Sequence, residues 1–192
     1  MEEIAAAHAA ALRARFGDEP VDVVGVSTGG SIAQQLAADH PGAVRRLVLQ
    51  STACRLGPHG RSLQRRVAVR IRRGARRQAL AVMAAELVPP YRGQLLAAAV
   101  AWTVGPSIFG ALDDMATTIE AEDGFDLPAC ASPIRAPTLL VAGAEDRFYP
   151  TELFAETARL IPDCRVDIIG GRGHITALSH PSVAPMVLGF LR

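Results

Sequence analysis

The sequence contains no lysine and few aromatic residues. All 20 basic residues of the 192-residue chain are arginines, and Phe, Trp and Tyr together make up 5%. With 19 acidic residues the formal net charge is +1, and 49% of the residues are hydrophobic. This balance excludes a disordered chain and a polyelectrolyte that binds nucleic acid through its overall charge. The exclusive use of arginine beside abundant alanine indicates a bias of the coding sequence.

Cysteine is also scarce. The three cysteines, Cys54, Cys130 and Cys164, are widely separated and form no C-x-x-C pair. This spacing excludes a disulfide framework and the usual arrangement of zinc ligands. We therefore expect reduced thiols and a protein that needs no metal and no cofactor.

Long apolar runs are absent as well. No stretch approaches the roughly 20 apolar residues that span a bilayer. The N-terminus begins with two acids where a signal peptide would carry positive charge, and His8 and Arg13 interrupt its alanines. We expect a cytoplasmic protein, and 192 residues are enough for one domain with a real core.

Short aliphatic runs alternate with helical patterns near both ends of the chain. Strands are expected at 21–26, 45–50, 137–143 and 165–171, and helices at 2–16, 31–40 and 151–161. This order predicts βαβ units, that is, an α/β fold with about four parallel strands flanked by helices. Residues 55–133 have a different, helical and strongly charged character. We interpret them as a helical cap inserted into a core formed by 1–54 and 134–192.

The first expected strand ends in a serine between glycines. The stretch GVSTG, residues 25–29, fits G-x-S-x-G, in which a sharp turn from strand to helix holds the serine in a strained backbone conformation. Larger side chains beside such a turn would collide with it, so Gly25, Gly29 and Gly30 are expected to provide clearance. The pentapeptide alone is a weak signal, and the strand before it and the helix after it strengthen it.

Two further residues could activate this serine. A serine hydroxyl needs a neighbouring base, and the base needs a group that fixes its tautomer. His174 follows the last strand in GGRGHI, and Asp146 follows the strand 137–143 in GAEDRFYP. Because parallel strands end on one edge of a sheet, Ser27, Asp146 and His174 are expected to converge there. Taken singly, each also fits an ordinary role, as a turn serine, a helix-capping acid or a loop histidine.

These three motifs resemble those of the α/β-hydrolase family. GVSTGG is similar to the family's nucleophile elbow, GAEDRFYP to its G-x-x-D-x-x-x-P acid loop and GRGHI to its histidine loop. The resemblance implies that Ser27 is the nucleophile, His174 the general base and later acid, and Asp146 its orienting partner. It also implies that the backbone N–H of Thr28 is an oxyanion donor. Glu145 is the alternative acid.

The chain departs from the family's pattern at its start. Full-length members have several strands before the helix that opens this chain, and a loop after one of them supplies a second oxyanion N–H. Without them the strand 21–26 would be an exposed edge of the sheet, a liability unless something covers it. We expect a truncated reading of a longer gene. The alternatives are self-association through the open edge, or a degenerate relative that binds without turnover.

The resemblance implies a serine hydrolase that acts on an ester, lactone or related acyl compound through an acyl-enzyme. A small hydrophobic acyl substrate is the expected partner. Tyr91, Trp102 and Phe109 of the expected cap are candidate pocket residues, although they fit the core of the cap equally well. The alternative function is that of a non-catalytic ligand-binding or interaction protein that retains the geometry of the site.

The expected cap also holds an arginine-rich segment. Residues 61–79 include eight arginines, with Leu63, Val67 and Ile71 on one helical face. Such a basic amphipathic helix could meet anionic lipid or an acidic substrate. Six acids lie at 113–126 of the same region, so internal charge pairing or solvation is the favoured interpretation. We expect neither a nucleic-acid nor a membrane partner.

Overall fold

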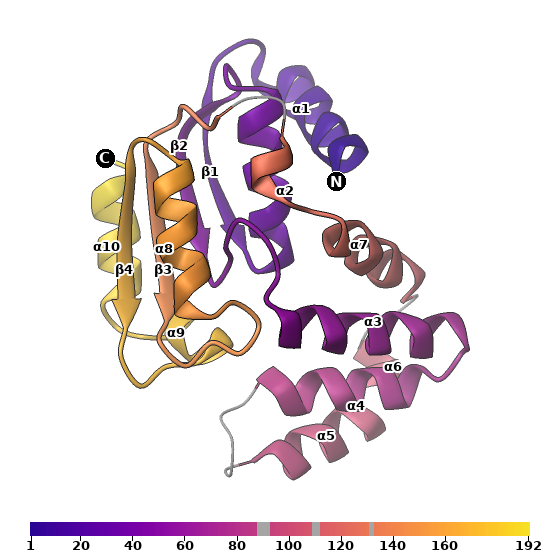
Figure 1. Ribbon diagram of the computed structural model, residues 1–192. Helices are drawn as coiled ribbons and strands as arrows, with labels where there is room; N and C mark the ends of the chain where they lie inside the picture. The colour runs from indigo at the N-terminus through magenta and orange to yellow at the C-terminus, as the bar shows by residue number, and fades with distance from the viewer. Residues whose placement is uncertain (88–92, 109–111, 131–132) are drawn as a thin grey trace.

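The computed structural model describes residues 1–87, 93–108, 112–130 and 133–192, and within them one four-stranded sheet (Figure 1). All neighbouring strands are parallel and follow the order of the chain. They are β1 (Val21–Val26), β2 (Val44–Gln50), β3 (Thr138–Gly143) and β4 (Cys164–Ile169). The expected α/β fold with about four parallel strands is confirmed, and the strand ends differ by no more than two residues.

Helices cover both faces of the sheet. On one face α2 (Thr28–Asp39) and α8 (Thr151–Leu160) pack over Leu47, Leu49 and Leu140. On the other face α10 (Val183–Phe190) packs over Val48, Leu139 and Val141. Every residue of β3 is consequently buried, which explains why its sequence TLLVAG is almost entirely apolar.

Two further helices complete this part of the chain. The N-terminal helix α1 (Glu2–Phe16) lies against α2 through the fully buried Ala5. The short α9 (His174–Leu178) follows β4 on the edge of the sheet where the strands end. Both α2 and α9 therefore begin at this edge, directly after β1 and shortly after β4.

A set of helices connects β2 to β3, and we call it the helical insertion. It comprises α3 (Pro58–Arg72), α4 (Arg76–Leu87), α5 (Gln94–Thr103), α6 (Gly105–Ile108) and α7 (Asp113–Asp123), and a 3-10 turn (Leu127–Ala129) follows it. Its apolar residues form a cluster of their own around Val67, Ile71, Leu80 and Ile119. Figure 1 shows the insertion beyond the end of the sheet at which the strands finish. The division into a core and a cap stays a prediction.

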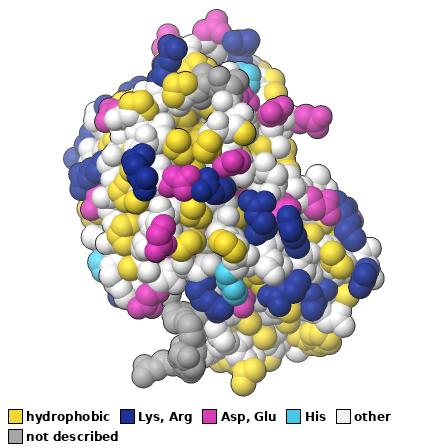
Figure 2. Space-filling view, viewed as in Figure 1, with side chains coloured by type: hydrophobic (Ala, Val, Ile, Leu, Met, Phe, Trp, Pro, Cys, Tyr) yellow, Lys and Arg dark blue, Asp and Glu magenta, His cyan; other side chains and the backbone are white. Residues whose placement is uncertain are grey.

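Charged side chains on the insertion pair with one another. Arg65 lies 2.8 Å from Asp123, and Arg72 lies 2.7 Å from Glu120, so arginines of α3 face acids of α7. Figure 2 shows acidic side chains among the arginines of this region. Exposed pairs of this kind contribute little to stability. They do neutralise part of the positive charge of the segment 61–79, as the interpretation of internal charge pairing expects.

Strand β1 is an edge of the described sheet. It is hydrogen-bonded to β2, and Val24 and Val26 are 48% and 39% exposed because α10 covers β2 and β3 but not β1. Exposed edges favour pairing with another strand. Self-association through this edge stays a prediction. No helix within the described ranges is long and apolar enough to cross a membrane.

The cysteines lie apart from one another as free thiols. Cys54, after β2, is fully buried, and burial raises the pKa of its thiol. Burial is also the main cause that raises the pKa of Cys130 to about 11 and that of Cys164 to about 11. Because the thiolate is the reactive form, none of these thiols is suited to act as a nucleophile near neutral pH.

The raised thiol pKa values predict slow chemical modification. At pH 8 a thiol with a pKa of about 11 is ionised to roughly one part in 1,000. We therefore expect Cys130 and Cys164 of the folded protein to react with Ellman's reagent on the order of 10²-fold more slowly than in guanidinium chloride. Cys54 should also react more slowly when the protein is folded, because it is fully buried. Stopped-flow absorbance measures both rates. A thiol that reacts equally fast in the folded and unfolded protein would contradict this prediction.

Candidate active site

Ser27 lies in a strained turn between β1 and α2. Its backbone has φ 51° and ψ −125°, a conformation that residues other than glycine rarely adopt. Its N–H donates to the carbonyl of Gln50, and its own carbonyl accepts from the N–H of Gly30 at 2.7 Å. Because strand and helix fix both sides of the turn, the serine side chain is held at the end of the sheet.

The glycines around Ser27 do not have equal roles. A Cβ added at Gly25 would lie 2.7 Å from the carbonyl oxygen of Gly29, and one added at Gly30 would lie 2.2 Å from Thr52. At Gly29 an added Cβ would meet no atom within 4 Å. The expected clearance is therefore required at Gly25, where β1 touches α2, and at Gly30, where α2 touches the segment after β2. Gly29 is exposed, and this packing does not require it to be glycine.

His174 connects Ser27 to Asp146. Its Nε2 lies 2.9 Å from Ser27 Oγ, and its Nδ1 lies 2.8 Å from Asp146 Oδ2. A carboxylate only accepts hydrogen bonds, so Nδ1 carries the proton and Nε2 is free to accept from the serine hydroxyl. Both His174 and Asp146 are buried, while Ser27 is partly accessible. The three residues thus converge at one edge of the sheet.

Asp146 is held by its own loop, and Glu145 is not part of this arrangement. Asp146 Oδ1 accepts from the backbone N–H groups of Phe148 and Tyr149 at 2.8 and 3.1 Å. Its other oxygen is thereby directed to His174. The side chain of Glu145 is exposed. The acid that contacts the histidine is Asp146, the first of the two candidates.

Three residues that sequence reasoning missed hold His174. Ser51, whose φ is 49°, donates to the carbonyl oxygen of His174 at 2.7 Å. The ring of Phe148 lies 4.6 Å from the imidazole, and that of Tyr149 lies stacked at 5.9 Å. Phe148 and Tyr149 belong to the motif GAEDRFYP, and their position two and three residues after Asp146 could have indicated that they lie near His174. Nothing around Ser51 in the sequence marks its role.

Thr28 is the first residue of α2. The N–H groups of the first helical turn have no partner within the helix, so the Thr28 N–H is available to a ligand next to Ser27. Its side-chain hydroxyl donates to Glu122 Oε2 at 2.6 Å. Glu122 was not expected here. The available signal was its position on α7, since it shares a buried helical face with Ala116 and Ile119.

Of the expected pocket residues, Trp102 lies in the described part of the chain. Trp102 is 41% exposed on α5, and it lines a cavity of about 390 Å³ with Pro106 and residues 74–78 inside the helical insertion. Tyr91 and Phe109 lie outside the described residues. Trp102 therefore belongs to a separate hollow, and the substrate pocket stays a prediction.

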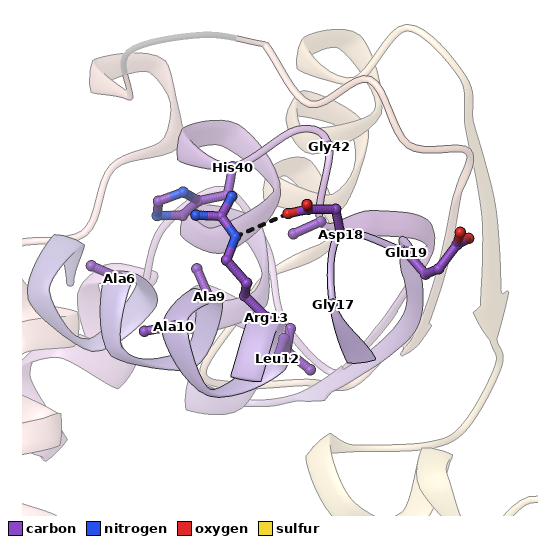
Figure 3. Close-up of a pocket in the computed structure, with 11 residues that line it drawn as sticks. Ala6, Ala9, Ala10, Leu12, Arg13, Gly17, Asp18, Glu19, His40 and Gly42 are labelled. Atoms are coloured by element: carbon purple, nitrogen blue, oxygen red, sulfur yellow. Dashed lines mark ion pairs between the residues drawn. The ribbon is translucent and has the colours of Figure 1, made fainter. Parts of the chain in front are cut away.

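Another cavity lies at the opposite end of the sheet. It measures about 430 Å³ between α1 and the turns that precede β1 and β2 (Figure 3). Among its charged residues, Arg13 and Asp18 are exposed and pair with each other at 3.1 Å. Within the described ranges no three His, Cys, Asp or Glu side chains lie together as a metal site. Ser27 with His174 and Asp146 is thus the arrangement best suited to chemistry.

Comparisons with known proteins agree with this fold. The family model described as "Alpha/beta hydrolase family" matches residues 2–184. The chain is 30% identical over 182 residues to "Putative carbamate hydrolase RutD" of Caulobacter sp. (strain K31), across 92% of this chain and 67% of that protein. It is 29% identical over 190 residues to the 2-hydroxymuconate semialdehyde hydrolase of Pseudomonas putida, across 96% and 66%. The chain spans about two thirds of these relatives.

A solved structure shares the fold. The enol-lactonase from Burkholderia xenovorans LB400 superimposes with a TM-score of 0.74 at 24% sequence identity. The similarity covers 94% of this chain and 68% of that one. The parallel sheet and its helices are therefore an arrangement that an experimentally determined structure also contains.

The different surroundings of the glycines predict different effects of the same substitution. Gly25→Ala should lower the free energy of unfolding by about 1–3 kcal/mol, because the new Cβ overlaps the backbone of α2. Gly29→Ala should leave it unchanged or raise it slightly, since alanine favours helices. Urea titration followed by circular dichroism measures both. Equal destabilisation by the two substitutions would contradict the packing described for this turn.

Proposed function

Because the chain belongs to the alpha/beta hydrolase family, and is thereby an enzyme of the hydrolase kind, we propose that it is a serine hydrolase. Its substrate is an ester, a lactone or a related acyl compound, and Ser27 forms the acyl-enzyme. One observation carries the proposal: the continuous relay from Ser27 Oγ through His174 to Asp146, with distances of 2.9 and 2.8 Å. A nucleophile within hydrogen-bond reach of an oriented base is the arrangement that acyl transfer requires.

The first half of the reaction transfers the acyl group to the enzyme. Ser27 Oγ attacks the carbonyl carbon while its proton passes to His174 Nε2. The imidazolium that forms is stabilised by Asp146, and the oxyanion accepts a hydrogen bond from the Thr28 N–H. The tetrahedral intermediate collapses with loss of the alcohol, which takes the proton from Nε2. The product of this half is an ester of Ser27.

The second half releases the acid. A water molecule gives a proton to His174 Nε2 and attacks the carbonyl of the acyl-enzyme. The second tetrahedral intermediate then expels Ser27 Oγ, which regains the proton. The strained turn serves both halves, because it presents the serine at one fixed place beside the helix N-terminus.

The relatives support a carbonyl substrate. One is named for the hydrolysis of a carbamate and another for that of a semialdehyde. Both names denote compounds with a carbonyl group, which is the group that an activated serine attacks. We extend this to carboxylic esters and lactones, small enough and apolar enough to reach Ser27 between the sheet edge and the helical insertion.

Labelling with a fluorophosphonate probe tests the proposal directly. The probe phosphonylates a serine only when a base activates it, so intact-mass and peptide spectra should place one adduct on Ser27. Ser27→Ala should remove the adduct. A folded protein that is not labelled would instead favour the alternative, a non-catalytic binding protein that keeps the site geometry. A series of p-nitrophenyl esters of increasing chain length then defines the acyl group.

The choice between the neighbouring acids is tested by a matched pair. Asp146→Asn should lower kcat on the best p-nitrophenyl ester by on the order of 10³- to 10⁴-fold, because the amide no longer fixes the tautomer of His174. Glu145→Gln should change kcat by less than about twofold, because its side chain is exposed and both ring nitrogens of His174 bond to other residues. A larger loss in Glu145→Gln than in Asp146→Asn would assign the acid to Glu145.

A further inference from the structure

Glu122 is a buried carboxylate that the proposed reaction does not use. Its side chain is 0% exposed. Oε1 accepts from Tyr149 Oη at 2.7 Å and from Ser31 Oγ at 2.9 Å. Oε2 accepts from Thr28 Oγ1 at 2.6 Å and from Gln64 Nε2 at 2.8 Å. A carboxylate offers about four acceptor positions, so these donors occupy all of them.

The four donors are all neutral groups. A buried charge is unfavourable unless its partners compensate for lost water, and here hydrogen bonds alone provide the compensation. An apolar side chain would fill the same space between α2 and α7 without this requirement. The arrangement of two donors on each oxygen therefore needs an explanation beyond packing.

Glu122 joins three parts of the molecule. Thr28 and Ser31 belong to the first turns of α2, the helix that starts directly after Ser27. Gln64, like Glu122 itself, belongs to the helical insertion. Tyr149 belongs to the loop that carries Asp146. One side chain thus connects the serine turn, the acid loop and the insertion.

Two of these contacts lead directly to the proposed catalytic groups. Thr28 follows Ser27 and carries the proposed oxyanion donor on its backbone, so the bond from its hydroxyl to Glu122 fixes the orientation of that residue. Tyr149 stacks on the ring of His174, and its N–H donates to Asp146. Burial raises the pKa of Tyr149 well above its ordinary value, with Glu122 as a further cause. The phenol therefore stays protonated and donates.

We propose that Glu122 is a positioning residue, which through Thr28 and Tyr149 sets the oxyanion donor and the His174 ring relative to Ser27. This inference rests on the proposed function. Glu122 touches neither Ser27 nor His174, so it acts only through its two neighbours. Because it is carried by α7, the site has its full geometry only while the helical insertion is docked on α2.

The substitution Glu122→Gln tests this role with nearly unchanged shape. The amide is neutral and presents an acceptor at one end only, so the groups at its other end must accept where they donated. All four hydrogen bonds also lose the strengthening that a charged acceptor gives. We expect kcat per active site on a p-nitrophenyl ester to fall by on the order of 10- to 100-fold, with KM within about twofold. Fluorophosphonate titration gives the concentration of sites, and the labelling rate should fall with kcat.

A matched control comes from the same helix. Glu120 pairs with Arg72 of α3 on an exposed face of α7, at 2.7 Å. Glu120→Gln removes a carboxylate of the same type from the insertion, and we expect its kcat and labelling rate to equal those of the wild type. If Glu122→Gln does not fold, Thr28→Val provides the test, since it removes one donor at constant shape and should lower kcat about 10-fold.

The outcomes separate the inference from the proposed function. A Glu122→Gln protein with reduced thermal stability but unchanged kcat per titrated site would show a merely structural role and overturn the inference. If it does not fold, an unchanged kcat in Thr28→Val would overturn it equally. A wild type that is neither labelled nor active would overturn the proposed function, and the inference with it.

Discussion

The strained turn at Ser27 is the constraint on which the rest of the structure depends. A serine at φ 51° costs on the order of 1–3 kcal/mol, and the surrounding packing has to hold it there. β1 and α2 do so because Gly25 and Gly30 let the helix approach the strand and Thr52 without side chains between them. Because α2 packs so closely against β1, its N-terminus lies next to the hydroxyl group of Ser27.

Convergence of the other groups follows from the parallel sheet. β1, β3 and β4 end on one edge, so residues 119 and 147 positions after Ser27 return to it without any local signal that links them. Gly143, at the end of β3, lets the histidine loop come close to the strand, since a Cβ there would lie 2.2 Å from the carbonyl oxygen of Arg172. The acid loop and the histidine loop can therefore touch, and Asp146 reaches His174.

The sequence was sufficient for those features that local patterns encode. Aliphatic runs predicted the strands because buried parallel strands need them, and three short motifs predicted Ser27, Asp146 and His174 because each follows a strand. The Glu122 contacts could not be predicted in this way. Its partners are up to 94 positions away, and their meeting depends on how α7 packs against α2. The cavity that Trp102 lines could not be predicted either, because it depends on how the helices of the insertion pack, and the substrate pocket stays a prediction.

Asp146 and Glu122 show two ways in which a fold can use a buried carboxylate. Asp146 shares its oxygens between its own loop and a histidine, so that its charge orients a base. Glu122 gives all its acceptor positions to neutral donors, so that its charge holds backbone and rings in place. The sheet edge brings the reacting groups within a few ångströms, but catalysis depends on smaller displacements than that. In the proposed function that finer adjustment depends on Glu122, whose hydrogen bonds connect α2 and the acid loop to the insertion.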